Sequence, residues 1–153
     1  MRLNTSAATI STLGYAGIIP FIVACGFAVI GLDAFASRLF FSYSAIILSF
    51  LGGSLWGRII SRQQAQSTTV LTALIASNVF ALAAFAALLL ISVGPLLPLV
   101  LLTAGFVAVL IAEQMVSGVL APVSAEVHPR YATLRAALSA AVLLLHGVFY
   151  FLV

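Results

Sequence analysis

The sequence lacks lysine altogether and carries few charges of any kind: six arginines and three acidic residues in 153 positions. Charged residues make up 6% of the chain, whereas typical soluble domains contain about 25%. This composition excludes an ordinary water-soluble fold. The arginines are scattered rather than clustered, so we expect no nucleic-acid partner, which would need a basic patch.

The chain also lacks the residue patterns of most catalytic and metal sites. Its one cysteine, Cys25, lies inside an apolar run, which predicts a buried structural thiol rather than a disulfide or a metal ligand. No HExxH, GxSxG, CxxC or phosphate-loop motif is present, and no single segment holds a pair of carboxylates. We therefore expect a protein that is not an enzyme and that has no metal and no cofactor.

The sequence is instead rich in long apolar runs, and 64% of its residues are hydrophobic. A membrane-spanning helix needs about 20 mostly apolar residues. Five segments qualify: 13–32, 39–57, 69–92, 96–121 and 134–153. These runs lack the alternation of barrel strands, and a helix satisfies its own backbone hydrogen bonds in hydrocarbon. The sequence predicts an all-α fold, a polytopic membrane protein with a five-helix transmembrane bundle, as one domain over residues 1–153.

The arginines predict an orientation for this bundle. Arg38 alone falls on one side of a five-span chain. The other side holds Arg2, Arg58, Arg62, Arg130 and Arg135. Positive residues collect on the cytoplasmic side of a membrane. We therefore expect the N-terminus inside and the C-terminus outside.

Small residues recur along the second apolar segment. Ala45, Ser49, Gly53 and Gly57 follow one another at intervals of four, which places them near one helical face. Small residues let two membrane helices approach closely, as in the GxxxG motif. The pattern predicts a helix-packing or partner interface. Its occupant could be another helix of this chain, a second protein or a ligand lying against the backbone.

Two further residues carry expectations about local structure. Pro20 lies well inside the first segment, where it has no N–H for the helix and should produce a kink. Trp56 lies two positions before Arg58, which favours an anchor at the membrane interface.

Glu113 is the most informative polar residue because it falls within the fourth apolar segment. An acidic side chain at the centre of a membrane helix costs about 2.5–3.5 kcal/mol, so a partner must offset this cost. Candidates for an intramembrane polar cluster are His146 and Asn78, estimated at a similar depth, and the longer side chains of Arg135 and Arg58. The cluster could serve proton-coupled transport or ligand binding. Alternatively, it could hold the helices together without further chemistry.

Three stretches carry a family resemblance: LGYAGIIPF (13–21), YSAIILSFLGGSLWG (43–57) and HPRYATLRAALSAAV (128–142). In this order they resemble the motifs of the transmembrane protein 69-like family, small five-span proteins of bacterial and mitochondrial inner membranes without an assigned function. Relatives tend to carry an acidic residue in helix four, matching Glu113, and an aromatic residue before a Leu-Arg pair, matching Tyr131. This chain departs from them in helix three, where Ser77 and Asn78 stand in place of the usual proline.

The resemblance implies a multi-pass protein of the bacterial inner (cytoplasmic) membrane. With it, the sequence favours a non-enzymatic accessory, assembly or stabilising protein of a larger energy-transducing membrane complex. Its partners would be membrane lipids and other integral membrane proteins, a respiratory or photosynthetic type of complex being one candidate. The alternative is a small proton-linked transporter, or a lipid- or quinone-binding membrane protein, that uses Glu113 and His146.

Overall fold

Long helices build the whole of the described structure. The computed structural model describes residues 9, 11–61, 68–119 and 128–153, and within these ranges all regular secondary structure is helical. The helices are α2 (Ile19–Val29), α3 (Asp33–Ile60), α4 (Thr68–Leu90), α5 (Leu96–Val119) and α6 (His128–Leu152). A short helical segment at residues 11–16 precedes α2.

The helices have the length and composition of membrane spans. Across the described ranges, five helical segments are long and apolar enough to cross a bilayer: Ser11–Val29, Asp33–Ile60, Thr68–Leu90, Leu96–Ser117 and Thr133–Leu152. Their outer faces expose large apolar side chains, with Phe151 86% accessible. Such a surface suits hydrocarbon and not water. The prediction of an all-helical, multi-pass membrane protein is confirmed.

Two helices begin earlier than the apolar runs indicated. The segment 33–38, predicted as a connection, forms the first turns of α3, and α6 begins at His128 instead of residue 134. Apolar runs mark only the part of a helix inside hydrocarbon, whereas backbone hydrogen bonding continues through polar residues beyond it. The connection between α2 and α3 is correspondingly short and turns at Gly31, whose φ of +80° suits glycine. Residues 120–121, predicted as the end of the fourth span, lie outside the described residues.

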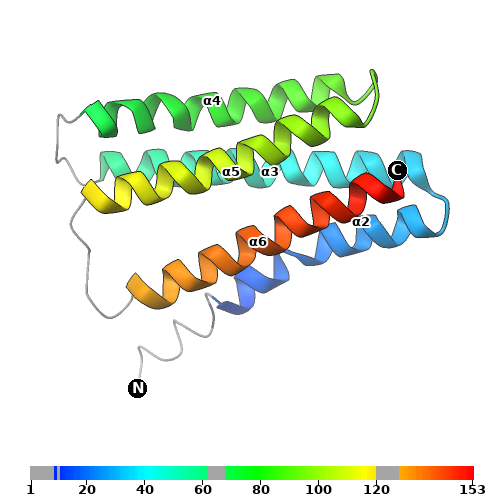
Figure 1. Cartoon of the computed structure of the whole chain (residues 1–153), viewed down its shortest axis with the longest axis horizontal. Coiled ribbons are helices and arrows are strands. Elements are labelled where there is room, and N and C mark those ends of the chain that lie inside the picture. The colour runs from blue at the N-terminus through cyan, green and yellow to red at the C-terminus, as the bar shows by residue number, and fades with distance from the viewer. Residues whose placement is uncertain (1–8, 10, 62–67, 120–127) are drawn as a thin grey trace.

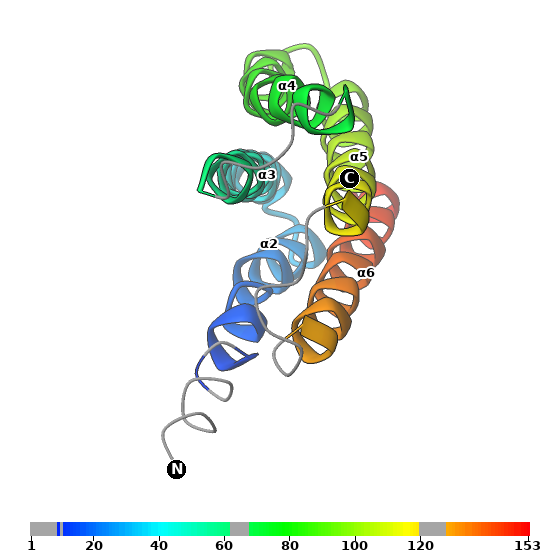
Figure 2. The ribbon, with the colours of Figure 1, turned by 90° about the vertical axis from the view of Figure 1, so that its left-hand side faces the viewer.

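The third helix, α3, forms the centre of the bundle. It packs against α2, α4 and α5, while α6 packs against α2 and α5. Viewed along the helices, α4 lies above α3 and α2 lies below it, while α5 and α6 form a second row beside them (Figure 2). The core follows α3, where Phe40, Phe41, Leu48 and Leu55 are almost fully buried.

The charged residues lie at the ends of this bundle. The connections from α2 to α3 and from α4 to α5 lie at one end, together with the C-terminal end of α6 (Figure 1). Arg38 lies in the part of α3 near this end. Arg58 and Arg135 lie toward the opposite end. Arg2 and Arg62, which also entered the orientation prediction, lie outside the described residues, as does the side chain of Arg130.

The first span is interrupted close to Pro20. Residues 17–18 form a turn between the segment 11–16 and α2, and Pro20 stands in the first turn of α2. The N–H of Phe21 donates to the carbonyl oxygen of Ile18 at 3.1 Å instead of reaching back to Gly17. The hydroxyl of Tyr43 on α3 donates to the Gly17 carbonyl oxygen at 2.9 Å. A side chain of α3 therefore satisfies a backbone group that the interruption frees.

Candidate functional site

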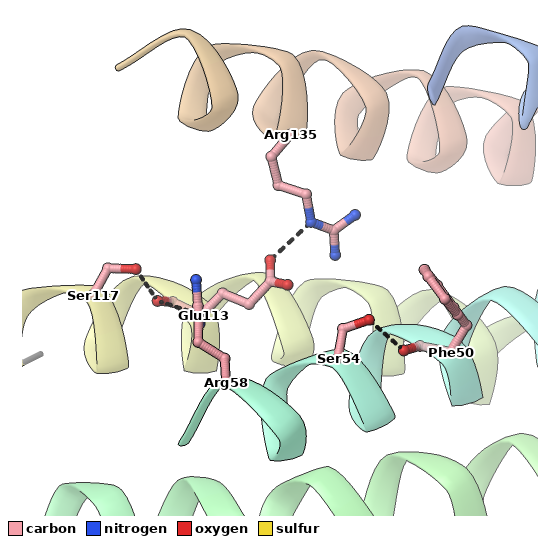
Figure 3. Close-up of polar contacts among 6 residues, drawn as sticks. All are labelled: Phe50, Ser54, Arg58, Glu113, Ser117 and Arg135. Carbon is pink, nitrogen blue, oxygen red and sulfur yellow. Dashed lines mark hydrogen bonds and ion pairs between the residues drawn. The ribbon is translucent and has the colours of Figure 1, made fainter. Parts of the chain in front are cut away.

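An ion pair connects α5 and α6 near the end of the bundle that carries Arg58. The Nε of Arg135 donates to Oε2 of Glu113 at 2.8 Å. The two side chains keep only 14% and 13% of their accessible surface. Figure 3 shows the Glu113 side chain pointing from α5 directly toward Arg135 of α6. The carboxylate that the sequence placed in an apolar segment thus faces an arginine.

A second arginine reaches the same residue from α3. Nη2 of Arg58 donates to the backbone carbonyl oxygen of Glu113 at 3.4 Å, and the hydroxyl of Ser117 donates to that oxygen at 2.7 Å (Figure 3). Glu113 is therefore the point where α3, α5 and α6 meet. We call Arg58, Glu113 and Arg135 the arginine site. It holds two guanidinium groups and one carboxylate, a formal charge of +1 when all three are ionised.

The arginine site contains a nitrogen without a partner. Nη2 of Arg135 is buried and makes no hydrogen bond within the described structure. Buried polar atoms of proteins are nearly always hydrogen-bonded, because an unpaired donor loses its water without compensation. The site therefore retains a donor that an additional acceptor can use.

Two side chains of α3 that precede Arg58 point toward α6. Figure 3 shows Ser54 and Phe50 pointing in this direction, with the Ser54 hydroxyl donating to the Phe50 carbonyl oxygen at 2.9 Å. Both residues are nevertheless exposed, Phe50 to 67%. The surface of α3 next to the arginine site is thus largely uncovered by the described chain.

A separate polar contact connects α6 to α3 at His146. Its Nδ1 donates to the carbonyl oxygen of Val142 at 2.9 Å, because a carbonyl can only accept. In the neutral ring Nε2 is then an acceptor, and the hydroxyl of Ser44 lies 3.4 Å from it. The imidazole is 1% exposed. It contacts the rings of Phe21, Phe40 and Phe106.

The structure divides the predicted polar cluster into separate places. Arg58, Glu113 and Arg135 lie together, whereas His146 lies eleven residues beyond Arg135 on α6, roughly 16 Å along a helix. Asn78 is exposed on α4, where its amide donates to the Leu74 carbonyl oxygen at 3.1 Å. Glu113 is hydrogen-bonded to Arg135 and His146 to Ser44, so the predicted pair of Glu113 with His146 is not formed.

The early start of α6 explains this separation. Because α6 begins at His128, His146 lies eighteen residues, roughly 27 Å, from the start of its helix. Glu113 lies six residues, roughly 9 Å, from the end of α5 at Val119. The two residues were predicted at similar depth only because α6 was expected to begin six residues later.

The predicted small-residue face does not stay on one side of α3. Ala45 is buried and Ser49 half-buried, but Gly53 and Gly57 are exposed, and a Cβ added to either glycine would meet nothing within 4 Å. Each step of four residues turns a helix through about 400°, so a stripe of such steps drifts by about 40° at each one. The stripe therefore begins in the core and ends on the outside.

Gly52 is the packing glycine that the motif did not identify. A Cβ added to it would lie 2.7 Å from the carbonyl oxygen of Ser77 on α4. The available signal was its register with Leu48 and Leu55, which keeps all three on the buried face. Trp56, the predicted interfacial anchor, is 45% exposed on the outside of the bundle.

An open apolar groove runs between α5 and α6. Its volume is about 720 Å³. The groove is lined by residues that include Val100, Ala104, Val107, Leu143, His146 and Phe151. Only Thr103, His146 and Tyr150 bring polar side-chain atoms to the lining. The described residues contain no group of three or more His, Cys, Asp or Glu side chains that could hold a metal ion.

The helices and their buried polar contacts define a class, that of multi-pass helical membrane proteins with charged groups placed between the spans. The chain belongs to the protein family DUF3429, described as a protein of unknown function, whose model matches residues 6–151. No match was found among curated proteins or among solved structures. The prediction that the chain belongs to a family without an assigned function is confirmed, and the match covers nearly the whole chain.

Proposed function

We propose that this protein is a non-enzymatic accessory, assembly or stabilising subunit that associates with a larger energy-transducing complex of the bacterial inner membrane. The observation that carries the proposal is the exposed part of α3 around Gly53 and Gly57, here called the α3 outer face. We also propose that the chain is a member of the transmembrane protein 69-like family. The proposal also includes an N-terminus inside, with Arg58 and Arg135 toward the cytoplasm and Arg38 toward the opposite side.

The glycines of the α3 outer face differ from those at which two helices of this chain pack closely together. At Gly52 and Gly105 an added Cβ would meet the described chain at 2.7 and 2.5 Å. At Gly53 and Gly57 it would meet nothing within 4 Å. An exposed glycine in a membrane helix destabilises the helix slightly but allows a second helix to approach its backbone. The α3 outer face therefore suits a helix from another membrane protein.

The proposal is tested by purifying the tagged full-length protein from its own membranes in a mild detergent. Stoichiometric partners are identified by mass spectrometry. Gly53→Leu should reduce the recovered partner complex at least fivefold, because the leucine would separate the two helices. The variant should remain monodisperse with an unchanged or slightly raised melting temperature, since position 53 has open space in the chain itself and leucine is the better helix former.

Gly26→Leu provides the matched control. Gly26 is also exposed, lies on α2 and has nothing within 4 Å of an added Cβ. Partner recovery should therefore be normal for this variant. Equal recovery from the wild type and from Gly53→Leu, or the absence of any stoichiometric partner protein, would refute the accessory role.

A second candidate function is supported by the groove between α5 and α6. Its apolar lining reaches His146, which suits a lipid- or quinone-like molecule with a long apolar chain. Because Glu113 and His146 are apart, the geometry favours ligand binding over a proton-linked function of that pair. The test is lipid mass spectrometry of the purified protein. Ala104→Trp should fill the exposed groove and remove a bound molecule, and its retention would argue against this site.

A further inference from the structure

We propose that the arginine site binds the phosphate group of an anionic phospholipid, whose acyl chain lies against the exposed surface of α3 at Phe50. This lipid site goes beyond the accessory role and does not require a protein partner. Gly53 and Gly57 lie on the same side of α3 as Phe50, so a partner helix and an acyl chain would cover overlapping surface. Arg58→Gln leaves both glycines in place and therefore tests the lipid site separately from the accessory role.

Charge supports an anionic ligand at this position. Arg58 and Arg135 contribute two positive charges against the one negative charge of Glu113. The other charged side chains that the structure describes, Asp33 and Arg38, lie in the first turns of α3, toward the opposite end of the bundle. The positive charge at the arginine site therefore remains without a full counter-charge in the described chain. Embedding such an excess near hydrocarbon is costly unless an anion approaches it.

The described residues use only part of the hydrogen-bonding capacity of the two arginines. A guanidinium group has five N–H donors. Nη2 of Arg135 is buried without a partner, and the one hydrogen bond that Arg58 makes to a described residue is long, at 3.4 Å. Arginine recognises phosphate by charge-assisted and often bidentate hydrogen bonds. A phosphate group that approaches either guanidinium would provide a missing acceptor.

The arginine site lies close to the helix ends, where a site for lipid headgroups is expected. Arg58 lies two residues from the end of α3, Glu113 six from the end of α5 and Arg135 seven from the start of α6. These positions correspond to roughly 3, 9 and 10 Å from the helix ends. The headgroup region is about 5–8 Å thick on each side of the hydrocarbon. Arginine side chains starting just below this region can extend toward lipid phosphates.

The neighbouring surface of α3 distinguishes a lipid from a free phosphate ion. Phe50 lies eight residues before Arg58 on the same helix, which is roughly 12 Å farther along the helix axis from this end of the bundle. Its ring points toward α6 and is 67% exposed (Figure 3). Ser54, between them, satisfies its hydroxyl on the Phe50 carbonyl oxygen and so presents little polarity. An acyl chain below a bound phosphate would cover this surface, whereas inorganic phosphate would leave it uncovered.

The test measures lipid retention by the full-length protein in a neutral detergent. Native mass spectrometry is recorded with equal amounts of phosphatidylglycerol, which is anionic, and phosphatidylcholine, which is not. The wild type should retain phosphatidylglycerol at least tenfold more strongly. A separate sample receives inorganic phosphate instead of lipid, and its melting temperature should stay unchanged. Arginine-dependent stabilisation by inorganic phosphate alone would overturn the assignment to a lipid.

Three variants locate the retained lipid. Arg58→Gln removes a guanidinium that pairs with no carboxylate among the described residues, and it should weaken phosphatidylglycerol retention about tenfold. Glu113→Gln combined with Arg135→Gln removes the ion pair without leaving a buried charge, and it should weaken retention similarly. Arg38→Gln is the control at the other end of α3 and should bind normally. Equal retention by the wild type and the two arginine-site variants, or equal retention of both lipids by the wild type, would overturn the proposal.

Discussion

Gly52 of α3 lies directly against the backbone of α4, so that a Cβ at this position would be 2.7 Å from the carbonyl oxygen of Ser77. A carbonyl oxygen within a helix cannot move away as the end of a flexible side chain can. The close approach of the two helices therefore depends on the absence of a side chain at position 52. The next residue, Gly53, faces away from α4 and has open space around it.

This contrast predicts opposite effects of the same substitution at adjacent positions. Gly52→Ala should destabilise the bundle by about 1–3 kcal/mol, the usual cost of overpacking. Gly53→Ala should be neutral or slightly stabilising, because alanine is the better helix former by about 1 kcal/mol. The measurement is the melting temperature of each purified variant in detergent. Equal behaviour of the two variants would contradict the packing of α3 on α4.

The sequence predicted the membrane fold because hydrophobicity and length alone determine which segments can cross a bilayer. It also identified Glu113, Arg135 and Arg58 as polar residues in or beside apolar segments. It did not predict their separation from His146. Depth was estimated from apolar boundaries, and α6 continues through polar residues to His128.

The glycine pattern shows a second limit of sequence reasoning. GxxxG spacing indicated that Gly53 and Gly57 lie near one face, but the direction of that face depends on the neighbouring helices. Ala45 begins the same stripe on the buried side, and the drift of the helix carries its other end outward. The structure also places Ser77, where the resemblance to the transmembrane protein 69-like family leads one to expect a proline nearby, in a continuous helix from Thr68 to Leu90.

The interruption near Pro20 depends on a hydrogen bond from another helix, which leads to a second prediction. Tyr43→Phe removes the hydroxyl that donates to the Gly17 carbonyl oxygen at 2.9 Å. The loss should destabilise the protein by about 0.5–1.5 kcal/mol. Thermal unfolding in detergent measures the effect. Tyr150→Phe, at an exposed tyrosine, is the control and should unfold like the wild type.

The contact of His146 with Ser44 provides a third prediction. Ser44→Ala leaves the Nε2 atom of a 1% exposed imidazole without its partner. The cost should be about 1 kcal/mol, as is typical of hydrogen bonds between membrane helices. His146→Phe should fit among the surrounding phenylalanine rings, so Ser44→Ala should cost less in that background. A double-mutant cycle of unfolding free energies measures this coupling. Strictly additive effects would show that the 3.4 Å contact contributes nothing.

The ion pair between Glu113 and Arg135 leads to the last prediction. Arg135→Gln leaves a carboxylate that is 13% exposed without its cation. The expected loss is about 3 kcal/mol, the lower end of the range for breaking a buried pair, because both side chains retain some accessible surface. Adding Glu113→Gln should recover more than half of this loss, since two neutral amides can hydrogen-bond to each other. Unfolding by increasing sodium dodecyl sulfate measures both free energies. If the double variant were less stable than Arg135→Gln alone, Glu113 would stabilise the bundle through contacts other than its partner on α6, the Arg58 hydrogen bond to its backbone being the first to examine.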